Sequence, residues 1–228
     1  MLRKLDALLD GSPLARIWQL IKWKVKYHLR GRGSVQPFEV LITWPHRPYL
    51  CEAIARLQPK TIFDLGCGKG PNLDLLHRRL PDAALTGTDP SAEAIAQAKT
   101  NLAACNVPAT LLVESADDMK RLAAGSFDAV LCDSVLFYIP PADIRRVLAE
   151  MMRVAKNGAV ISTWHFDAQG NDPVRYDDST WIYDYRALMA GLRDIDIEIA
   201  AFPDDAWEDP RWRRYGAIIT ARHRRNLQ

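Results

Sequence analysis

Thr61-Ile-Phe-Asp-Leu-Gly-Cys-Gly-Lys-Gly-Pro-Asn72 is the stretch that decides the fold of this chain. It begins as a short apolar run, interrupted by Asp64, and then turns through Gly66, Gly68 and Gly70. After the turn, leucines recur three and four residues apart, which is the spacing of a helix. Glycines let the backbone approach a ligand closely, and the N-terminus of a helix offers free N–H groups. The stretch therefore predicts a strand, a glycine turn and a helix that together hold a charged or nucleotide-like ligand.

The alternation of strand and helix patterns continues from Lys60 to the end of the chain, which indicates βαβ units and a parallel sheet. The sequence therefore predicts an α/β fold with a doubly wound, mostly parallel sheet of seven strands. The expected strands are residues 61–65, 84–88, 109–113, 127–132, 159–163, 195–199 and 215–221. The expected helices are 71–80, 91–104, a short one after 118, 141–155 (capped by Asn157-Gly158) and 182–191, with a polar loop at 166–180.

Composition fits one ordinary domain with a small extension, because the hydrophobic fraction is 48% and the charged fraction 25%. The net charge of +2 is spread unevenly. Residues 1–33 carry eight Lys or Arg against two Asp, and residues 211–228 carry six Arg and no acid, so the region between them is acidic. Basic ends favour an anionic surface, either a membrane or a nucleic acid, and ends that are merely solvated are the alternative.

The four cysteines, Cys51, Cys67, Cys105 and Cys132, do not have the spacing of metal ligands. Free thiols in a reducing compartment are therefore expected, and no metal site is predicted. No apolar run reaches the roughly 18 residues of a membrane span, and the N-terminus lacks the uninterrupted apolar centre of a signal peptide. The sequence predicts a cytoplasmic protein.

Residues 1–58 are expected to form an N-terminal helical extension on a domain of residues 59–228. Within the extension, residues 13–30 carry an apolar stripe at helical spacing, flanked by lysines. Such a helix can lie at the surface of an anionic membrane. Packing on the protein's own core or on a partner subunit, as in a homodimer, is the alternative.

A second motif is Ser126-Phe-Asp-Ala-Val-Leu-Cys-Asp-Ser-Val-Leu-Phe-Tyr-Ile-Pro140. Together with the glycine turn it resembles the class I S-adenosylmethionine (SAM)-dependent methyltransferases, in particular the branch that acts on small molecules and lipids. The resemblance covers residues 60–165 and, loosely, the last strand. It implies a Rossmann-like methyltransferase fold, SAM as the cofactor, and methyl transfer to an oxygen or nitrogen of a small-molecule or lipid- or glycan-linked acceptor.

The resemblance also implies a set of cofactor-binding residues at the carboxyl ends of the strands. They are Asp64, Gly66, Cys67, Gly68, Asn72, Asp89, Pro90, Ala116, Asp117, Asp133 and Ser134. In this family the segment before the first strand often folds over the cofactor as a lid. Trp44, His46, Arg47 and Tyr49 are therefore candidates for the roof of the site, and a packed turn outside the site is the alternative.

Three acidic positions carry the physical argument for this site. A carboxylate inside an apolar strand is unfavourable by several kcal/mol unless it is paired, so Asp64 is expected to face a cationic group, and the resemblance assigns it the methionine amino group. Asp89 ends a strand about 20 residues after the turn, where a carboxylate can accept both ribose hydroxyls; capping the next helix is the alternative. By resemblance, Asp117 rather than Asp118 is expected to bind the adenine amino group, again with a helix cap as the alternative.

One departure separates this turn from a nicotinamide dinucleotide site. Pro71 stands where the third glycine of the G-x-G-x-x-G fingerprint would fall, which argues against an NAD-dependent oxidoreductase.

The sequence contains fewer indications of the residues that bind the methyl acceptor. His165, Tyr138 and His46 are candidates for a general base, which a hydroxyl acceptor would need. The aromatic residues Trp164, Phe166, Trp181 and Tyr183 are expected to wall the acceptor pocket. An RNA methyltransferase that uses the basic ends, and a non-catalytic SAM-binding or scaffold protein, are the alternative functions.

Overall fold

The computed structural model describes residues 36–167, 173–177 and 180–224. The predicted helix at residues 13–30, with its expected membrane contact, lies outside the described residues. No helix in the described parts of the chain is long and apolar enough to cross a membrane.

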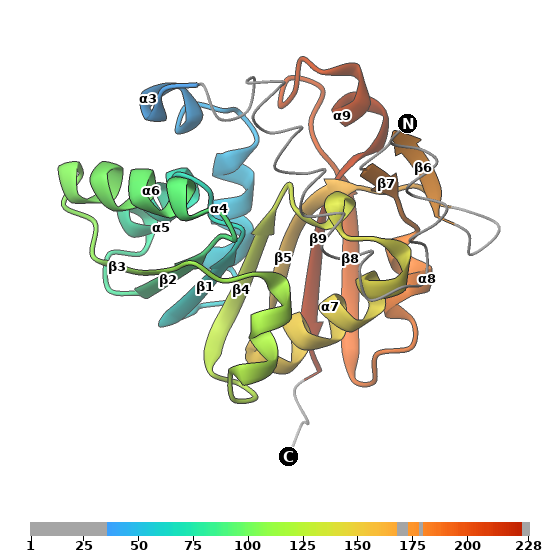
Figure 1. Ribbon diagram of the computed structural model, residues 1–228. Helices are drawn as coiled ribbons and strands as arrows, with labels where there is room; N and C mark the ends of the chain where they lie inside the picture. Colours follow the sequence, from blue (N-terminus) through green and yellow to red (C-terminus); the bar gives the residue numbers. More distant parts are fainter. Residues whose placement is uncertain (1–35, 168–172, 178–179, 225–228) are drawn as a thin grey trace, which may run out of the picture.

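A seven-stranded sheet in the order β3-β2-β1-β4-β5-β9-β8 forms the centre of the molecule (Figure 1). The first five strands in this order are parallel, and β9 runs antiparallel to both β5 and β8. The strands are β1 Thr61–Leu65, β2 Ala84–Thr88, β3 Ala109–Leu112, β4 Phe127–Asp133, β5 Ala155–Trp164, β8 Ile195–Ala201 and β9 Gly216–His223. The predicted doubly wound fold is confirmed.

Helices cover both faces of the sheet and enclose two cores. One core involves α4 (Arg47–Ala55), α5 (Pro71–Arg79) and α6 (Ala92–Ala104), and the other involves η1 (Ala116–Arg121), α7 (Pro141–Val154) and α8 (Tyr185–Met189). Along β1, Ile62 packs in the first core, while Phe63 and Leu65 pack in the second. Because strand residues alternate between faces, Asp64 points toward the face covered by α4 and α5.

The position of β1 between β2 and β4 creates a switch point in the sheet. In open α/β sheets, ligands bind outside the carboxyl ends of the strands at such a point. In Figure 1 these ends point upward, and the short helices α3 (Phe38–Leu41) and α9 (Pro210–Tyr215) lie toward the same edge. The fold therefore brings the segment before β1 and the segment before β9 to the edge where a ligand is expected.

Three local predictions were wrong. The expected polar loop at 166–180 contains the hairpin strand β6 (Val174–Asp177), which pairs with β7 (Thr180–Ile182), and α9 was not expected. Asn157-Gly158 does not cap α7, because β5 already begins at Ala155. Pairing with β4 and β9 extends the strand back to the end of the helix and overrides the local Asn-Gly signal.

We expect Gly158→Ala to destabilise the protein, because β9 passes directly over this position. A Cβ atom on Gly158 would lie 2.2 Å from the carbonyl oxygen of Ala221, which is backbone that cannot rotate away. Overpacking of this kind destabilises by about 1–3 kcal/mol. Urea denaturation measures the effect, with Gly191→Ala as the control, because a Cβ at Gly191 meets no atom within 4 Å. Equal midpoints for the two variants would show that β5 and β9 are not packed in this register.

Candidate functional site

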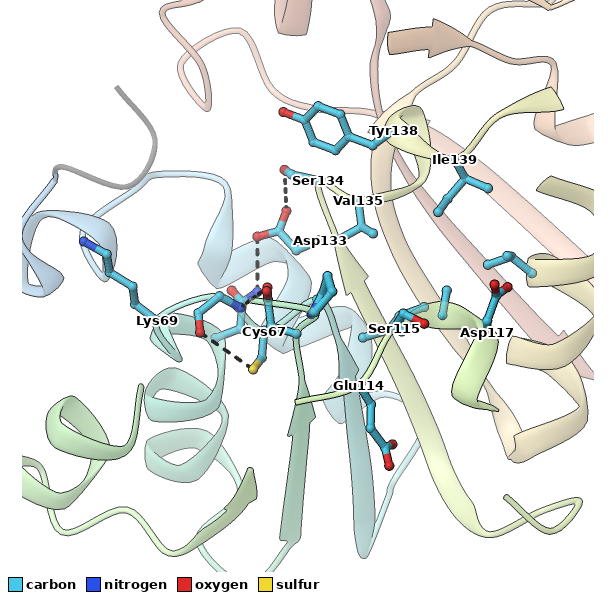
Figure 2. A pocket seen from close by; sticks show the side chains of 18 of the residues that line it. Cys67, Lys69, Glu114, Ser115, Asp117, Asp133, Ser134, Val135, Tyr138 and Ile139 are labelled. Atoms are coloured by element: carbon cyan, nitrogen blue, oxygen red, sulfur yellow. Dashed lines mark hydrogen bonds between the residues drawn. The ribbon is translucent and has the colours of Figure 1, made fainter. Parts of the chain in front are cut away.

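A cavity of about 380 Å³ opens at the carboxyl ends of β1, β2 and β4 (Figure 2). Its volume lies within the usual range for small-molecule sites, about 300–1,000 Å³. Ten of the eleven predicted cofactor residues line it: Gly66, Cys67, Gly68, Asn72, Asp89, Pro90, Ala116, Asp117, Asp133 and Ser134. The exception is Asp64, which lies behind the wall.

The glycine turn after β1 forms the floor of this cavity. The backbone N–H groups of Gly66 and Cys67 donate to the carbonyl oxygen of Thr88, at 2.8 and 2.9 Å, and so fix the turn against the end of β2. Gly66 has a φ of +79°, and a Cβ there would lie 2.4 Å from a methyl carbon of Val135. Gly68 has a φ of +55°, but a Cβ there would meet no atom within 4 Å. The backbone at Gly68 therefore borders open space in which a ligand can approach it.

Asp89 lies beside this turn at the end of β2. Its Oδ2 accepts a hydrogen bond from the Gly68 N–H at 3.2 Å, and its Oδ1 accepts one from the Ser91 N–H at 2.8 Å. The residue that caps α6 is Ser91, whose Oγ accepts from the Ala94 N–H, so the alternative that Asp89 is the cap is wrong. Burial raises the pKa of Asp89, although these two N–H groups oppose the shift. The structure thus leaves a nearly buried carboxyl group on the cavity wall.

The two acidic residues after β3 have separate surroundings. Asp118 Oδ2 accepts from both the N–H and the Oγ of Ser115, each at 2.9 Å, which completes a capping box at the start of η1. Asp117 instead lines the cavity and forms an ion pair with Arg146 of α7. Figure 2 shows Ser115 and Asp117 on the side of the cavity that faces η1. The structure places Asp117 on the cavity wall, as expected, and gives the cap to Asp118.

Asp133, at the end of β4, is the centre of a buried polar network. Its Oδ2 accepts hydrogen bonds from Arg47 Nη1 at 2.9 Å, His46 Nε2 at 3.1 Å and Asn72 Nδ2 at 3.2 Å. Its Oδ1 accepts from the Ser134 hydroxyl at 2.9 Å. Burial alone would raise the pKa of Asp133, but the His46 ring and the Arg47 guanidinium hold it far below its ordinary value. Asp133 therefore carries a negative charge at the cavity wall throughout the physiological pH range.

Asp64 is a second buried carboxyl group, and its protonation differs from that of Asp133. Its side chain is fully buried, and neither carboxyl oxygen has a hydrogen-bond partner among the described residues. Burial, and next the nearby Asp133 carboxylate, raise the pKa of Asp64 from 3.8 to about 8, while Arg47 opposes the shift. The carboxyl group is therefore mostly protonated at neutral pH.

The roof expected over the site is present in part. Trp44 and Arg47 line the cavity together with Leu41 of α3, whereas Tyr49 is 40% exposed and does not line it. His46 is fully buried behind Asp133, where its ring stacks on Trp207 with centroids 4.0 Å apart. The residues before β1 therefore reach the cavity mainly through Trp44 and Arg47.

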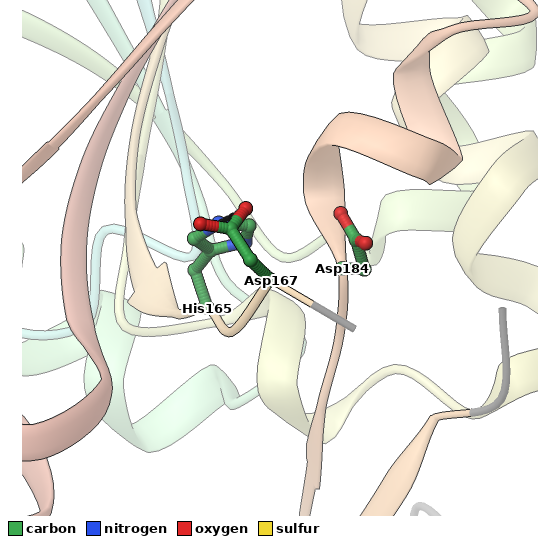
Figure 3. A group of neighbouring side chains, drawn as sticks. All are labelled: His165, Asp167 and Asp184. Atoms are coloured by element: carbon green, nitrogen blue, oxygen red, sulfur yellow. Dashed lines mark hydrogen bonds and ion pairs between the residues drawn. The ribbon is translucent and has the colours of Figure 1, made fainter. Parts of the chain in front are cut away.

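The three candidates for a general base do not come together. Only Tyr138 lines the cavity. His165 lies elsewhere, beside Asp167 and across from Asp184 (Figure 3), and these three side chains have ligand atoms within 4.8 Å of one another. His165 Nδ1 accepts from the Tyr185 N–H, which leaves the proton of a neutral ring on Nε2, facing Asp167. The Asp184 side chain accepts a hydrogen bond from the Ala187 N–H and so caps α8. The side chains of His165, Asp167 and Asp184 therefore have structural roles that need no cation.

None of the four aromatic residues expected around the acceptor lines the cavity. Trp164 stacks on Phe137 at 4.5 Å, and Trp181 and Tyr183 are buried in the core beside α7. The sequence analysis also missed several lining residues, namely Leu41, Ser115, Val135, Ile139 and Arg146. Ser115 and Val135 follow strand ends, which is a usable signal, but nothing local marks Leu41 or Arg146.

Comparison with known proteins identifies a domain in this chain. Residues 62–158 match the family model described as a methyltransferase domain. Chondramide synthase of Chondromyces crocatus is 31% identical over 163 residues, which make up 68% of this chain and 4% of that protein. Trans-aconitate 2-methyltransferase of Yersinia pestis is 44% identical over 68 residues, 30% of this chain and 26% of that enzyme. The chain thus spans only a small part of the length of these curated relatives.

A solved structure matches over almost the whole chain. It is 1,6-didemethyltoxoflavin-N1-methyltransferase of Burkholderia thailandensis, with bound 1,6-didemethyltoxoflavin and S-adenosylhomocysteine. Its TM-score is 0.71 at 16% identity, and the match covers 94% of this chain and 92% of that one. At this identity the likeness shows a shared fold.

We expect Asp64→Asn to stabilise the protein increasingly as the pH rises. Folding raises the pKa of Asp64, so the stability gained by keeping this carboxyl neutral is complete below pH 3.8 and is lost as the pH rises to about 8. Asparagine does not ionise, and one pKa unit corresponds to about 1.4 kcal/mol, so the gain should reach several kcal/mol above pH 8.

Urea denaturation of the wild type and the variant between pH 5 and pH 9 measures this difference. Asp82→Asn, at an exposed position, is the control and should follow the wild type. A constant difference between Asp64→Asn and the wild type across this range would contradict the assigned protonation of Asp64.

Proposed function

We propose that this protein, whose residues 62–158 match a methyltransferase domain, is a class I SAM-dependent methyltransferase. It would transfer a methyl group from SAM to an oxygen or nitrogen of a small-molecule or lipid- or glycan-linked acceptor. The observation that carries the proposal is the open space over Gly68, bordered by the buried carboxyl group of Asp89. A nucleoside needs both features, since its ribose must approach the backbone and offers two hydroxyl donors to a carboxylate.

The residues present fit this cofactor at several points of the cavity. Asp89 would hold the ribose hydroxyls, and Asp117 would lie at the adenine end beside Ala116. Asp64, whose carboxyl oxygens have no hydrogen-bond partner among the described residues, lies behind the turn and does not line the cavity, so no contact with the cofactor is assigned to it. SAM, when bound, supplies an electrophilic methyl group on a sulfonium.

The acceptor would enter at the end of the cavity opposite Asp117. Leu41, Trp44 and Tyr138 offer apolar and aromatic surface there, and Ser134 and Asp133 offer polar atoms. Figure 2 shows Tyr138, Ser134 and Asp133 following one another along this wall. Because methyl transfer is an in-line displacement, the main task of these residues is to position the acceptor atom, and Tyr138 is the candidate base nearest to it.

The comparisons support a small acceptor without fixing its atom. Trans-aconitate 2-methyltransferase is named for trans-aconitate, and the Burkholderia thailandensis enzyme for N1 of 1,6-didemethyltoxoflavin.

We expect Asp89→Ala to weaken binding of S-adenosylhomocysteine at least tenfold, which corresponds to about 1.4 kcal/mol. The variant removes the acceptor for the ribose hydroxyls and a partner of the Gly68 N–H. Isothermal titration calorimetry measures the dissociation constant, and Glu93→Ala, at an exposed position on α6, is the control. An unchanged dissociation constant for Asp89→Ala would remove the ribose assignment, and no binding to the wild type would remove the proposed function.

A further inference from the structure

Two elements form the end of the cavity where the adenine is proposed to bind. The short helix η1 contributes Ala116 and Asp117 to the lining. The start of α7 and the two residues before it contribute Ile139, Pro140, Asp143, Arg146 and Val147. Figure 2 shows Asp117 and Ile139 on this side of the cavity. Three of the residues from the α7 side have apolar side chains, which suit the faces of a purine ring, and the polar ones are Asp143 and Arg146.

Arg146 connects the two elements at this end of the cavity. Its Nη2 donates to Oδ1 of Asp117 and, at 3.1 Å, to Oδ1 of Asp143. Because both carboxylates accept from the same nitrogen atom, they lie close together on the cavity wall. The side chain of Asp143 is only 9% exposed, so it is largely out of reach of bulk water. Two carboxylates that share a single guanidinium keep an excess of negative charge, which favours a ligand that offers N–H donors.

The packing of η1 on α7 does not account for these ion pairs. Arg153, two turns farther along α7, already ties the two elements together, because its guanidinium donates to the carbonyl oxygens of Met119 and Leu122. Arg146 and Asp117 are 38% and 42% exposed, and ion pairs between such side chains contribute little to stability. Their position on the cavity wall points instead to a role in binding.

We propose that Asp117 and Asp143 each accept one of the two hydrogens of the adenine amino group, and that Arg146 is the positioning residue that holds the two carboxylates as a pair. This inference rests on the proposed function and adds to it a specificity-determining residue, Asp143, from α7. The amino group is the part of adenine that offers two N–H donors. A site that binds both hydrogens rejects a nucleoside in which one of them is replaced, since a buried acceptor then loses its donor.

The test compares S-adenosylhomocysteine with its N6-methyl derivative, in which a methyl group replaces one of the two amino hydrogens. With a single acceptor, the remaining N–H can face that acceptor while the methyl group turns away. With two acceptors, one hydrogen bond must be lost. In calorimetric titrations the wild type should therefore bind the N6-methyl derivative about tenfold more weakly than S-adenosylhomocysteine. Equal dissociation constants for the two ligands would overturn the inference.

Asp143→Ala should weaken S-adenosylhomocysteine about tenfold and change the N6-methyl derivative by less than about twofold, because it removes one acceptor and makes room for the methyl group. The ratio of the two dissociation constants should thus fall toward one. Glu150→Ala is the matched control, because Glu150 pairs with Arg153 at the same i,i+3 spacing on the same helix but does not line the cavity. It should keep the wild-type ratio. A wild-type ratio in Asp143→Ala would overturn the role of Asp143.

Variants of Arg146 keep the test decisive if Asp143→Ala fails to fold, since Asp143 is an acidic residue in the first turn of α7. Arg146→Met leaves both carboxylates in place but removes the link between them, so the ratio should fall, and Arg146→Lys, which keeps the positive charge, should restore part of it. A wild-type ratio in folded Arg146→Met would overturn the positioning role.

The same titrations separate this inference from the proposed function. Binding of neither ligand by the wild type would overturn the proposed function and this inference with it. Binding of both ligands with equal affinity would overturn the inference alone.

Discussion

The hydrogen bonds that converge on the Asp133 carboxylate hold the site together. Its donors come from three places far apart in the sequence: the segment before β1, the start of α5 and the end of β4. An ionised, buried carboxylate is tolerated only where such donors surround it. The network therefore fixes the loop after β4 relative to the glycine turn, and the cavity lies between them.

The same network explains why two carboxyl groups a short distance apart differ in charge. His46 and Arg47 donate hydrogen bonds to Asp133, so this carboxyl group stays ionised. Asp64 lies behind it without a hydrogen-bond partner among the described residues and stays protonated. Two like charges in one buried region push their pKa values apart.

The sequence alone predicted those features that depend on residues close together along the chain. The strand and helix patterns predicted which elements follow one another along the chain. The glycine turn and Asp89 predicted that the cavity lies at the carboxyl ends of the strands. The Asp133–Arg47 contact spans 86 residues, so no local pattern could reveal it. Tertiary pairing also decided that Gly158 lies within β5 and that the aromatic residues Trp164 and Tyr183 pack into the protein rather than around an acceptor.

The central claim is that this cavity holds an adenosyl cofactor between the glycine turn and Asp89. A crystal structure of the protein grown with S-adenosylhomocysteine tests it most directly. We expect density for the ribose over Gly68, with its hydroxyls on Asp89, and for the adenine beside Asp117. A cavity filled by protein side chains, or the ligand bound at another place, would contradict the account.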